Sequence, residues 1–159
     1  VLEAHIQYKE GGELVLLNTH LEAFSKQTDT LQKQVAQIAS LLTGFSKQNI
    51  PWIIAGDFNL LPPNQYSMLP TRQQTYYRPV SEIYELTNQF PCIPSMEDVK
   101  SDPSAWHSFY SNDPEVISPD RTLDYLFYSP LLSCQSKTIR QHDTINISDH
   151  FPIIASFNL

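Results

Sequence analysis

The fold class is decided by residues 52–59, Trp52-Ile53-Ile54-Ala55-Gly56-Asp57-Phe58-Asn59, where an apolar run ends in a polar cluster. The first four residues would be apolar on both faces of a strand, which is typical of a central strand covered on both sides. Pro51 precedes the run and Gly56 ends it, as expected at strand boundaries. The stretch therefore predicts an α/β sheet with polar groups directly after a buried strand.

The residues before this stretch predict a strand followed by a helix. A strand is expected over 13–21, after the turn signal Gly11-Gly12. A helix is expected over 28–43, with Gly44 as its C-terminal stop. Its apolar residues recur at steps of three and four: Leu31, Val35, Ile38, Leu42 and Phe45. The order strand, helix, strand fits a crossover unit.

The residues after it predict a long irregular middle and a return to strands. We expect a loop over 60–79, followed by a short helix over 80–90 whose inward residues are Val80, Ile83, Tyr84, Leu86 and Phe90. An irregular segment is expected over 91–119, with a brief strand at 106–110. Further strands are expected at 122–128, 136–140 and 151–157. Segments of such length often shape a substrate surface. The two irregular segments, 60–79 and 91–119, carry seven aromatic or imidazole side chains: Tyr66, Tyr76, Tyr77, Trp106, His107, Phe109 and Tyr110. We favour packing of these rings onto the sheet over a wall that contacts substrate.

Composition and charge restrict the function classes. With 159 residues, 41% of them apolar and 17% charged, the chain reads as one globular domain. The net charge is −7 and the ten basic residues are dispersed, which disfavours a binder of long nucleic acid. No apolar stretch reaches the length of a membrane span.

The chain ends and the cysteines carry less information. The chain opens on Val1 rather than Met, so we expect its native start further upstream. Its compartment stays open, with the cytoplasm favoured, and so does its oligomeric state. Cys92 and Cys134 have no metal-type spacing. We expect two unpaired thiols, with a single disulfide as the alternative.

Four polar clusters lie at or beside the ends of these strands, where α/β sheets bind ligands. The clusters are Asn18-Thr19-His20, Gly56-Asp57-Phe58-Asn59, Arg121-Thr122-Leu123-Asp124-Tyr125 and Ser148-Asp149-His150. Each alone has an ordinary interpretation, as a turn, a cap or a strand-end histidine. Asp124 is the exception, because a carboxylate within an apolar strand needs a partner.

Together the clusters supply the groups needed for attack of water on phosphorus. Asp57 and Asp149 can hold a hard cation and orient water. Asn59 can donate hydrogen bonds to a phosphoryl oxygen, and His20 and His150 can move protons near neutral pH. Asp124 is suited to orient a histidine and favour its protonated form. Arg121 could face a phosphate.

These four clusters resemble, in order and context, the last four motifs of the endonuclease/exonuclease/phosphatase superfamily. The resemblance runs from about residue 13 to the C-terminus. It implies that residues 1–159 form the C-terminal part of a single domain, a four-layer α/β sandwich of mixed β-sheets flanked by helices, here without the N-terminal strands. The first half of that domain, with an Asn and a metal-binding Glu, has no counterpart in this sequence.

The resemblance also implies roles for the matched residues. His20 would be a general acid or phosphate ligand, and Asp57 would engage water or a metal beside Asn59. Asp124 would pair with His150, and Asp149 would bind the cation. Asn18 and Arg121 are the expected substrate-binding residues. The implied cofactor is Mg²⁺, with Mn²⁺ as a substitute.

Three functions follow as hypotheses. We favour a hydrolase of small or lipid phosphoesters, because the chain is acidic and lacks basic clusters. The first alternative is an endonuclease or exonuclease on DNA or RNA. The second is a non-catalytic binding module on the same fold, which is disfavoured because each matched position keeps a chemically competent residue.

Overall fold

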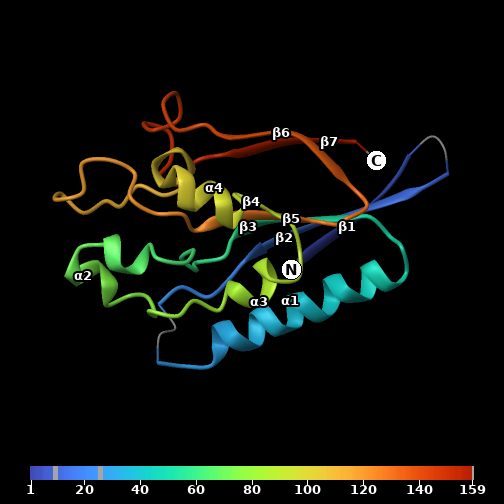
Figure 1. Ribbon diagram of the computed structural model, residues 1–159, viewed down its shortest axis with the longest axis horizontal. Coiled ribbons are helices and arrows are strands. Elements are labelled where there is room, and N and C mark those ends of the chain that lie inside the picture. Colours follow the sequence, from blue (N-terminus) through green and yellow to red (C-terminus); the bar gives the residue numbers. More distant parts are fainter. Residues whose placement is uncertain (9–10, 25–26, 159) are drawn as a thin grey trace.

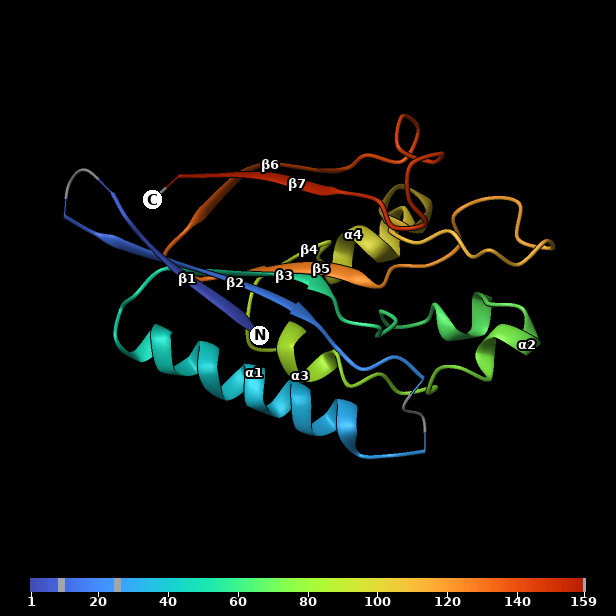
Figure 2. The same cartoon turned by 180° about the vertical axis from the view of Figure 1, so that it is seen from behind.

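The computed structural model describes residues 1–8, 11–24 and 27–158. Figure 1 shows three layers: helices, a large sheet and a two-stranded sheet on the opposite side of the large one. Figure 2 shows the same layers from behind. The predicted α/β fold, with a mixed sheet and flanking helices, is confirmed. None of the helices in these ranges is long and apolar enough to span a membrane.

The large sheet has the strand order β1-β2-β3-β5-β4. Its strands are β1 (Leu2–Gln7), β2 (Glu13–His20), β3 (Trp52–Asp57), β4 (Cys92–Ile93) and β5 (Asp124–Tyr128). The β2 and β3 strands run parallel, and every other neighbouring pair is antiparallel. The small sheet pairs β6 (Ser133–Ile139) with β7 (Ile153–Asn158) in antiparallel fashion.

The helix α1 (Thr30–Lys47) covers one face of the large sheet and provides the crossover between β2 and β3. Its buried residues Leu31, Val35, Ile38 and Leu42 meet β2, β3 and β5 in one core. The expected stop at Gly44 is wrong. Phe45 packs against the core and extends the helix, and Asn49 then takes the left-handed backbone conformation, with a φ of 56°, that ends it.

Apart from β4, the elements in the middle of the chain are short helices and 3₁₀ turns. These are α2 (Thr71–Gln74), α3 (Tyr84–Thr87), α4 (Met96–Ser101) and the 3₁₀ turns η1 (Tyr66–Met68) and η2 (Pro103–Trp106). The helix expected over 80–90 is therefore reduced to α3, although Ile83, Leu86 and Phe90 are buried as expected. Val80, expected to point inward, is exposed.

The strand expected over 106–110 is also absent. Only Phe109 forms isolated bridges, to Arg121 and to His150. Conversely, β1 was missing from the expected elements, and all six of its residues are exposed. Cys92 and Cys134 are free thiols, as expected. Burial raises the pKa of Cys92 to about 12, so this thiol stays protonated.

Candidate active site

The register of the sheet aligns three candidate residues in one row. His20, the last residue of β2, pairs with Asp57, the last residue of β3. Asp57 pairs in turn with Asp124, the first residue of the antiparallel strand β5. Three adjacent strands therefore present an imidazole and two carboxyl groups at the same edge of the sheet. The sequence had indicated that Asp124 lies inside a strand. In the structure it is the first residue of β5.

Gly56 allows β2 and β3 to approach each other next to this row. Its φ is +150°, and a Cβ at this position would lie 1.8 Å from the carbonyl oxygen of Thr19. Any other residue would push the two strands apart exactly where His20 and Asp57 meet. Glycine is therefore required for the geometry of the row as well as for the backbone angle.

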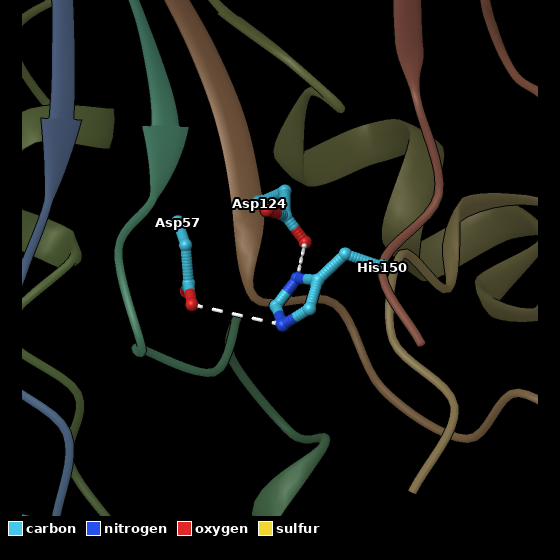
Figure 3. A group of neighbouring side chains, drawn as sticks. All are labelled: Asp57, Asp124 and His150. Atoms are coloured by element: carbon cyan, nitrogen blue, oxygen red, sulfur yellow. Dashed lines mark hydrogen bonds and ion pairs between the residues drawn. The ribbon is translucent and has the colours of Figure 1, made fainter. Parts of the chain in front are cut away.

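His150 completes the group from the segment before β7. Its Nδ1 donates to Asp124 Oδ2 over 2.9 Å, which is the pairing that the resemblance implies. Its Nε2 points toward Asp57 and lies 3.8 Å from Oδ2, while His20 Nε2 lies 3.6 Å from the same oxygen. Figure 3 shows the imidazole of His150 between the two carboxyl groups. Asp57 Oδ2 is thus flanked by two imidazoles.

The electrostatics of the site favour a protonated His150 and a basic Asp57. The hydrogen bond to Asp124 is the main cause that raises the pKa of His150. Burial is the main cause that raises the pKa of Asp57, and the nearby charge of Asp124 adds to it. The backbone N–H of Asn59 opposes this shift by donating to Asp57 Oδ1 over 2.8 Å.

Asn59 links the turn after β3 to the end of β2. Its φ is 52°, a left-handed conformation that asparagine tolerates better than most residues. Its Nδ2 donates to the carbonyl oxygen of Leu21 over 3.0 Å. The amide therefore holds two chain segments together, and among the described residues its second N–H has no hydrogen-bond partner.

Ser108 is a buried residue of this site that sequence reasoning missed. Its Oγ donates to Asp124 Oδ2 over 2.7 Å. Ser108 Oγ also accepts hydrogen bonds from the backbone N–H groups of Leu123, over 3.0 Å, and Asp124, over 2.9 Å. Both acceptor positions are thus filled by groups that can only donate, so the hydroxyl proton must point to Asp124.

The segment around Ser108 joins the two segments that carry Asp124 and His150. The N–H of Ser108 donates to the carbonyl of Arg121, and the carbonyl of Ser108 accepts from Phe151. The N–H of Tyr110 donates to the carbonyl of Asp149. The local sequence Trp-His-Ser-Phe-Tyr contains a serine between aromatic residues, but nothing in it indicates a partner sixteen positions away.

Arg121 is buried and fully engaged rather than open to a ligand. Its Nε and Nη2 donate to the two carboxylate oxygens of Asp120, and its Nη1 donates to Gln73 and Tyr77. Its guanidinium carbon lies 5.6 Å from the ring centre of Tyr77 and 5.5 Å from that of Phe109. Only 1% of Arg121 is exposed, so a phosphate would meet at most one edge of it.

A pocket of about 460 Å³ connects these residues. Six of the eight candidate residues line it: His20, Asp57, Asn59, Arg121, Asp149 and His150. Asn18 does not; its Nδ2 donates to the carbonyl of Ala55 over 3.2 Å. Asp124 lies behind His150, bonded to it and to Ser108. Asp149 is exposed on the wall of the pocket.

The ligand atoms of Asp57, Asp124 and His150 lie within 4.8 Å of one another and could hold a metal ion. Asp124 and His150, however, already satisfy each other. The carboxylates that remain available to a cation are those of Asp57 and Asp149, which line the same pocket. Such an oxygen-rich donor set fits a hard divalent cation.

Comparisons with known proteins support the fold of the endonuclease/exonuclease/phosphatase group. No protein-family model matches the sequence, and no curated protein sequence is significantly similar to it. Among solved structures, the chain is similar to an endonuclease/exonuclease/phosphatase from Beutenbergia cavernae, with 19% identity, a TM-score of 0.58 and coverage of 99% of this chain and 38% of the other.

Two further structures share this fold. The catalytic domain of human Nocturnin with bound sulfate has 20% identity and a TM-score of 0.63, over 97% of this chain and 50% of its own. An AP endonuclease from Archaeoglobus fulgidus has 15% identity and a TM-score of 0.64, over 92% and 62%. The chain thus spans 38% to 62% of the lengths of these three structures. The resemblance inferred from the four motifs is confirmed at the level of the fold.

Proposed function

We propose that the protein is a metal-dependent hydrolase that cleaves phosphoester bonds of small or lipid substrates. The observation that carries this proposal is the row of His20, Asp57 and Asp124 with His150 hydrogen-bonded to Asp124. The fold is shared with structures described as a phosphatase-group protein and an AP endonuclease. Fold alone does not define an activity, so the proposal rests on the site.

The geometry suggests a role for each group. Asp57 Oδ2 is the best-placed base, because burial raises its pKa, against the lowering effect of the two nearby imidazoles, and because the residue lines the pocket. His150 carries a proton on Nε2 more readily than an isolated histidine, since Asp124 stabilises the imidazolium. A protonated Nε2 facing the pocket would stabilise negative charge that develops on a phosphoryl oxygen. His20, exposed on the other side, would donate a proton to the departing alcohol.

Asp57 and Asp149 would hold the cation, which we expect to be Mg²⁺ or Mn²⁺. When bound, a divalent cation neutralises phosphoryl charge and lowers the pKa of water. Asn59 would then position the phosphoryl group through its remaining amide N–H, next to the carboxyl group of Asp57. Ser108 and Asp124 keep the imidazole of His150 in a fixed orientation.

The charge of the pocket favours a small substrate over a long nucleic acid. Among the described residues that line the pocket, Arg121 is the only lysine or arginine. Its charge is balanced by Asp120, and the whole chain carries −7. Tight binding of a nucleic acid backbone needs several unpaired cations that release counterions. DNA remains the competing substrate, because an AP endonuclease shares the fold.

A substrate panel tests the proposal on the full-length protein. We expect hydrolysis of bis(p-nitrophenyl) phosphate and of glycerophosphodiesters with Mg²⁺, its loss in EDTA, and its recovery with Mg²⁺ or Mn²⁺. Phosphodiester lipids in vesicles test the lipid arm of the same proposal. Nicking of plasmid DNA at physiological salt, without turnover of the small esters, would show that the substrate is nucleic acid and not a small phosphoester. No metal-dependent hydrolysis of any of these substrates would overturn the proposal.

A further inference from the structure

Two aromatic side chains stand exposed at the rim of the candidate active site. Phe24 is 74% exposed and Tyr76 is 49% exposed. Their ring centres lie 5.2 Å apart at an interplanar angle of 64°, an edge-to-face contact. Both residues line the pocket of about 460 Å³ that also contains Asp57 and His150. The two rings come from segments that are far apart in the sequence and meet only here.

Packing accounts for the other rings of this region but leaves this pair unexplained. Tyr66, Tyr77 and Phe109 pack against a small buried cluster of Leu61, Leu69 and Leu123. Phe24 and Tyr76 belong to neither buried cluster of the described residues. A single exposed apolar residue is common on protein surfaces, whereas a contact pair beside a polar pocket often marks a ligand site.

The backbone of Phe24 adds an independent observation. Its φ is 60°, in the left-handed region that a bulky residue without a special reason avoids. The side chain of this residue contacts the ring of Tyr76. Outliers of this kind collect at ligand sites, where the surrounding structure holds them.

Aromatic surface continues from the rim to the catalytic groups. Tyr77 follows Tyr76, and the guanidinium carbon of Arg121 lies over the rings of both Tyr77 and Phe109. The ring of Phe109 lies 4.9 Å from the imidazole of His150. A ligand that reaches from His150 to Phe24 would therefore pass along ring side chains, and not along an aliphatic groove.

We propose that Phe24 and Tyr76 form a subsite that binds a planar aromatic group of the substrate. This inference rests on the proposed function and narrows its substrate class to small phosphoesters that carry such a group. Edge-to-face rings leave ring faces free for stacking, which suits a flat ring better than an alkyl chain. A pocket of about 460 Å³ is also of the size that holds one small ligand.

A matched pair of ligands tests the subsite without requiring turnover. We would measure binding of 5′-AMP and of ribose 5-phosphate to the full-length protein by calorimetry with Mg²⁺ present, because the two ligands differ by the base. Phenyl phosphate, compared with inorganic phosphate, distinguishes a simple aryl group from a nucleobase. We expect 5′-AMP to bind about tenfold tighter than ribose 5-phosphate, the lower end of what stacking on an aromatic side chain provides.

Variants of Phe24 and Tyr76 test whether the two rings cause the tighter binding of 5′-AMP. The double variant Phe24→Ala/Tyr76→Ala should lose the advantage of 5′-AMP and keep the affinity for ribose 5-phosphate. Phe24→Tyr should retain the advantage, because the ring remains. Met68→Ala is the control, since Met68 is exposed but does not line this pocket. Equal affinities for the two ligands in the wild type, or an advantage that survives in the double variant, would overturn the subsite.

The outcome separates this inference from the proposed function. A base-dependent affinity that the double variant abolishes, without hydrolysis of any phosphoester, would support the subsite and reject the hydrolase. Metal-dependent hydrolysis without a base-dependent affinity would support the hydrolase and reject the subsite.

Discussion

The row of catalytic candidates and the aromatic rim of the same pocket are built in opposite ways. His20, Asp57 and Asp124 are placed by the register of three paired strands, and hydrogen bonds from Asn59 and Ser108 hold the carboxyl groups of Asp57 and Asp124. Phe24 and Tyr76 extend from loops and lie largely in solvent. Chemistry that demands fixed distances is therefore built into the sheet, while recognition is left to segments that can vary.

Among the variants that test this contrast, a substitution of Asp57 should have the largest effect on turnover. The variant Asp57→Asn keeps the size of the side chain and removes the base between the two imidazoles. We expect turnover of a small phosphodiester to fall by roughly 10²- to 10⁴-fold, with little change in the melting temperature. A variant with near-normal turnover would show that the row at the sheet edge is not the reaction centre.

Two glycines test how far the sheet itself sets the geometry. At Gly56 a Cβ would lie 1.8 Å from Thr19 O, whereas at Gly44 in α1 it would meet nothing within 4 Å. We expect Gly56→Ala to lower the free energy of unfolding by about 3 kcal/mol. Gly44→Ala should raise it by about 0.5 kcal/mol. Urea denaturation measures both, and equal effects would contradict the close approach of β2 and β3.

Substitutions of Ser108 test whether its hydrogen bond to Asp124 contributes to turnover. Ser108→Ala removes the donor to Asp124 and should cost about tenfold in turnover, because a hydrogen bond to a charged group contributes about 1.5 kcal/mol or more. Ser108→Thr keeps the hydroxyl and should restore most of the rate. Ser104→Ala is the control, since the hydroxyl of this exposed serine donates to Asp102 and not to Asp124. A fully active Ser108→Ala protein, or a Thr variant as poor as the Ala variant, would remove Ser108 from this account.

The smallest expected effect is the pH dependence of stability from His150. Its pKa is raised in the folded state, so its protonation stabilises the fold below the ordinary value of 6.5. This contribution is lost as the pH rises through the raised pKa. The difference in unfolding free energy between the wild type and His150→Gln, measured without metal, should therefore shrink from pH 5 to pH 9. Taking the difference cancels the similar contribution of His5, whose pKa is also raised.

The sequence predicted which polar residues lie together at the sheet edge better than it predicted the bounds of the helices and strands around them. Asp57 and His150 stand out because polar groups interrupt apolar runs, and this signal is local. The extent of α1 was missed because the packing of Phe45 outweighs the helix-ending tendency of Gly44. The strand β1 was missed although Leu2, Ala4 and Ile6 alternate with polar residues. It is a six-residue edge strand that is exposed throughout.

Ser108 and the pair of Phe24 and Tyr76 show what local patterns cannot supply. Ser108 donates a hydrogen bond to Asp124, which lies sixteen positions further along the sequence. The two rings are in contact although Phe24 and Tyr76 are 52 positions apart. The sequence interpretation favoured packing for all rings of the middle segment. That interpretation holds for Tyr66, Tyr77 and Phe109, which pack on the small cluster, and fails for the exposed Tyr76. Only the positions of distant residues distinguish these cases.

The most direct test of the central claim is a double-mutant cycle of turnover on Asp124→Asn, His150→Ala and the combined variant. Because Asp124 acts through His150, we predict that the combined variant is no slower than His150→Ala alone, with a coupling free energy of about 2 kcal/mol. Independent effects that multiply in the double variant would contradict the claim that these residues form one catalytic unit.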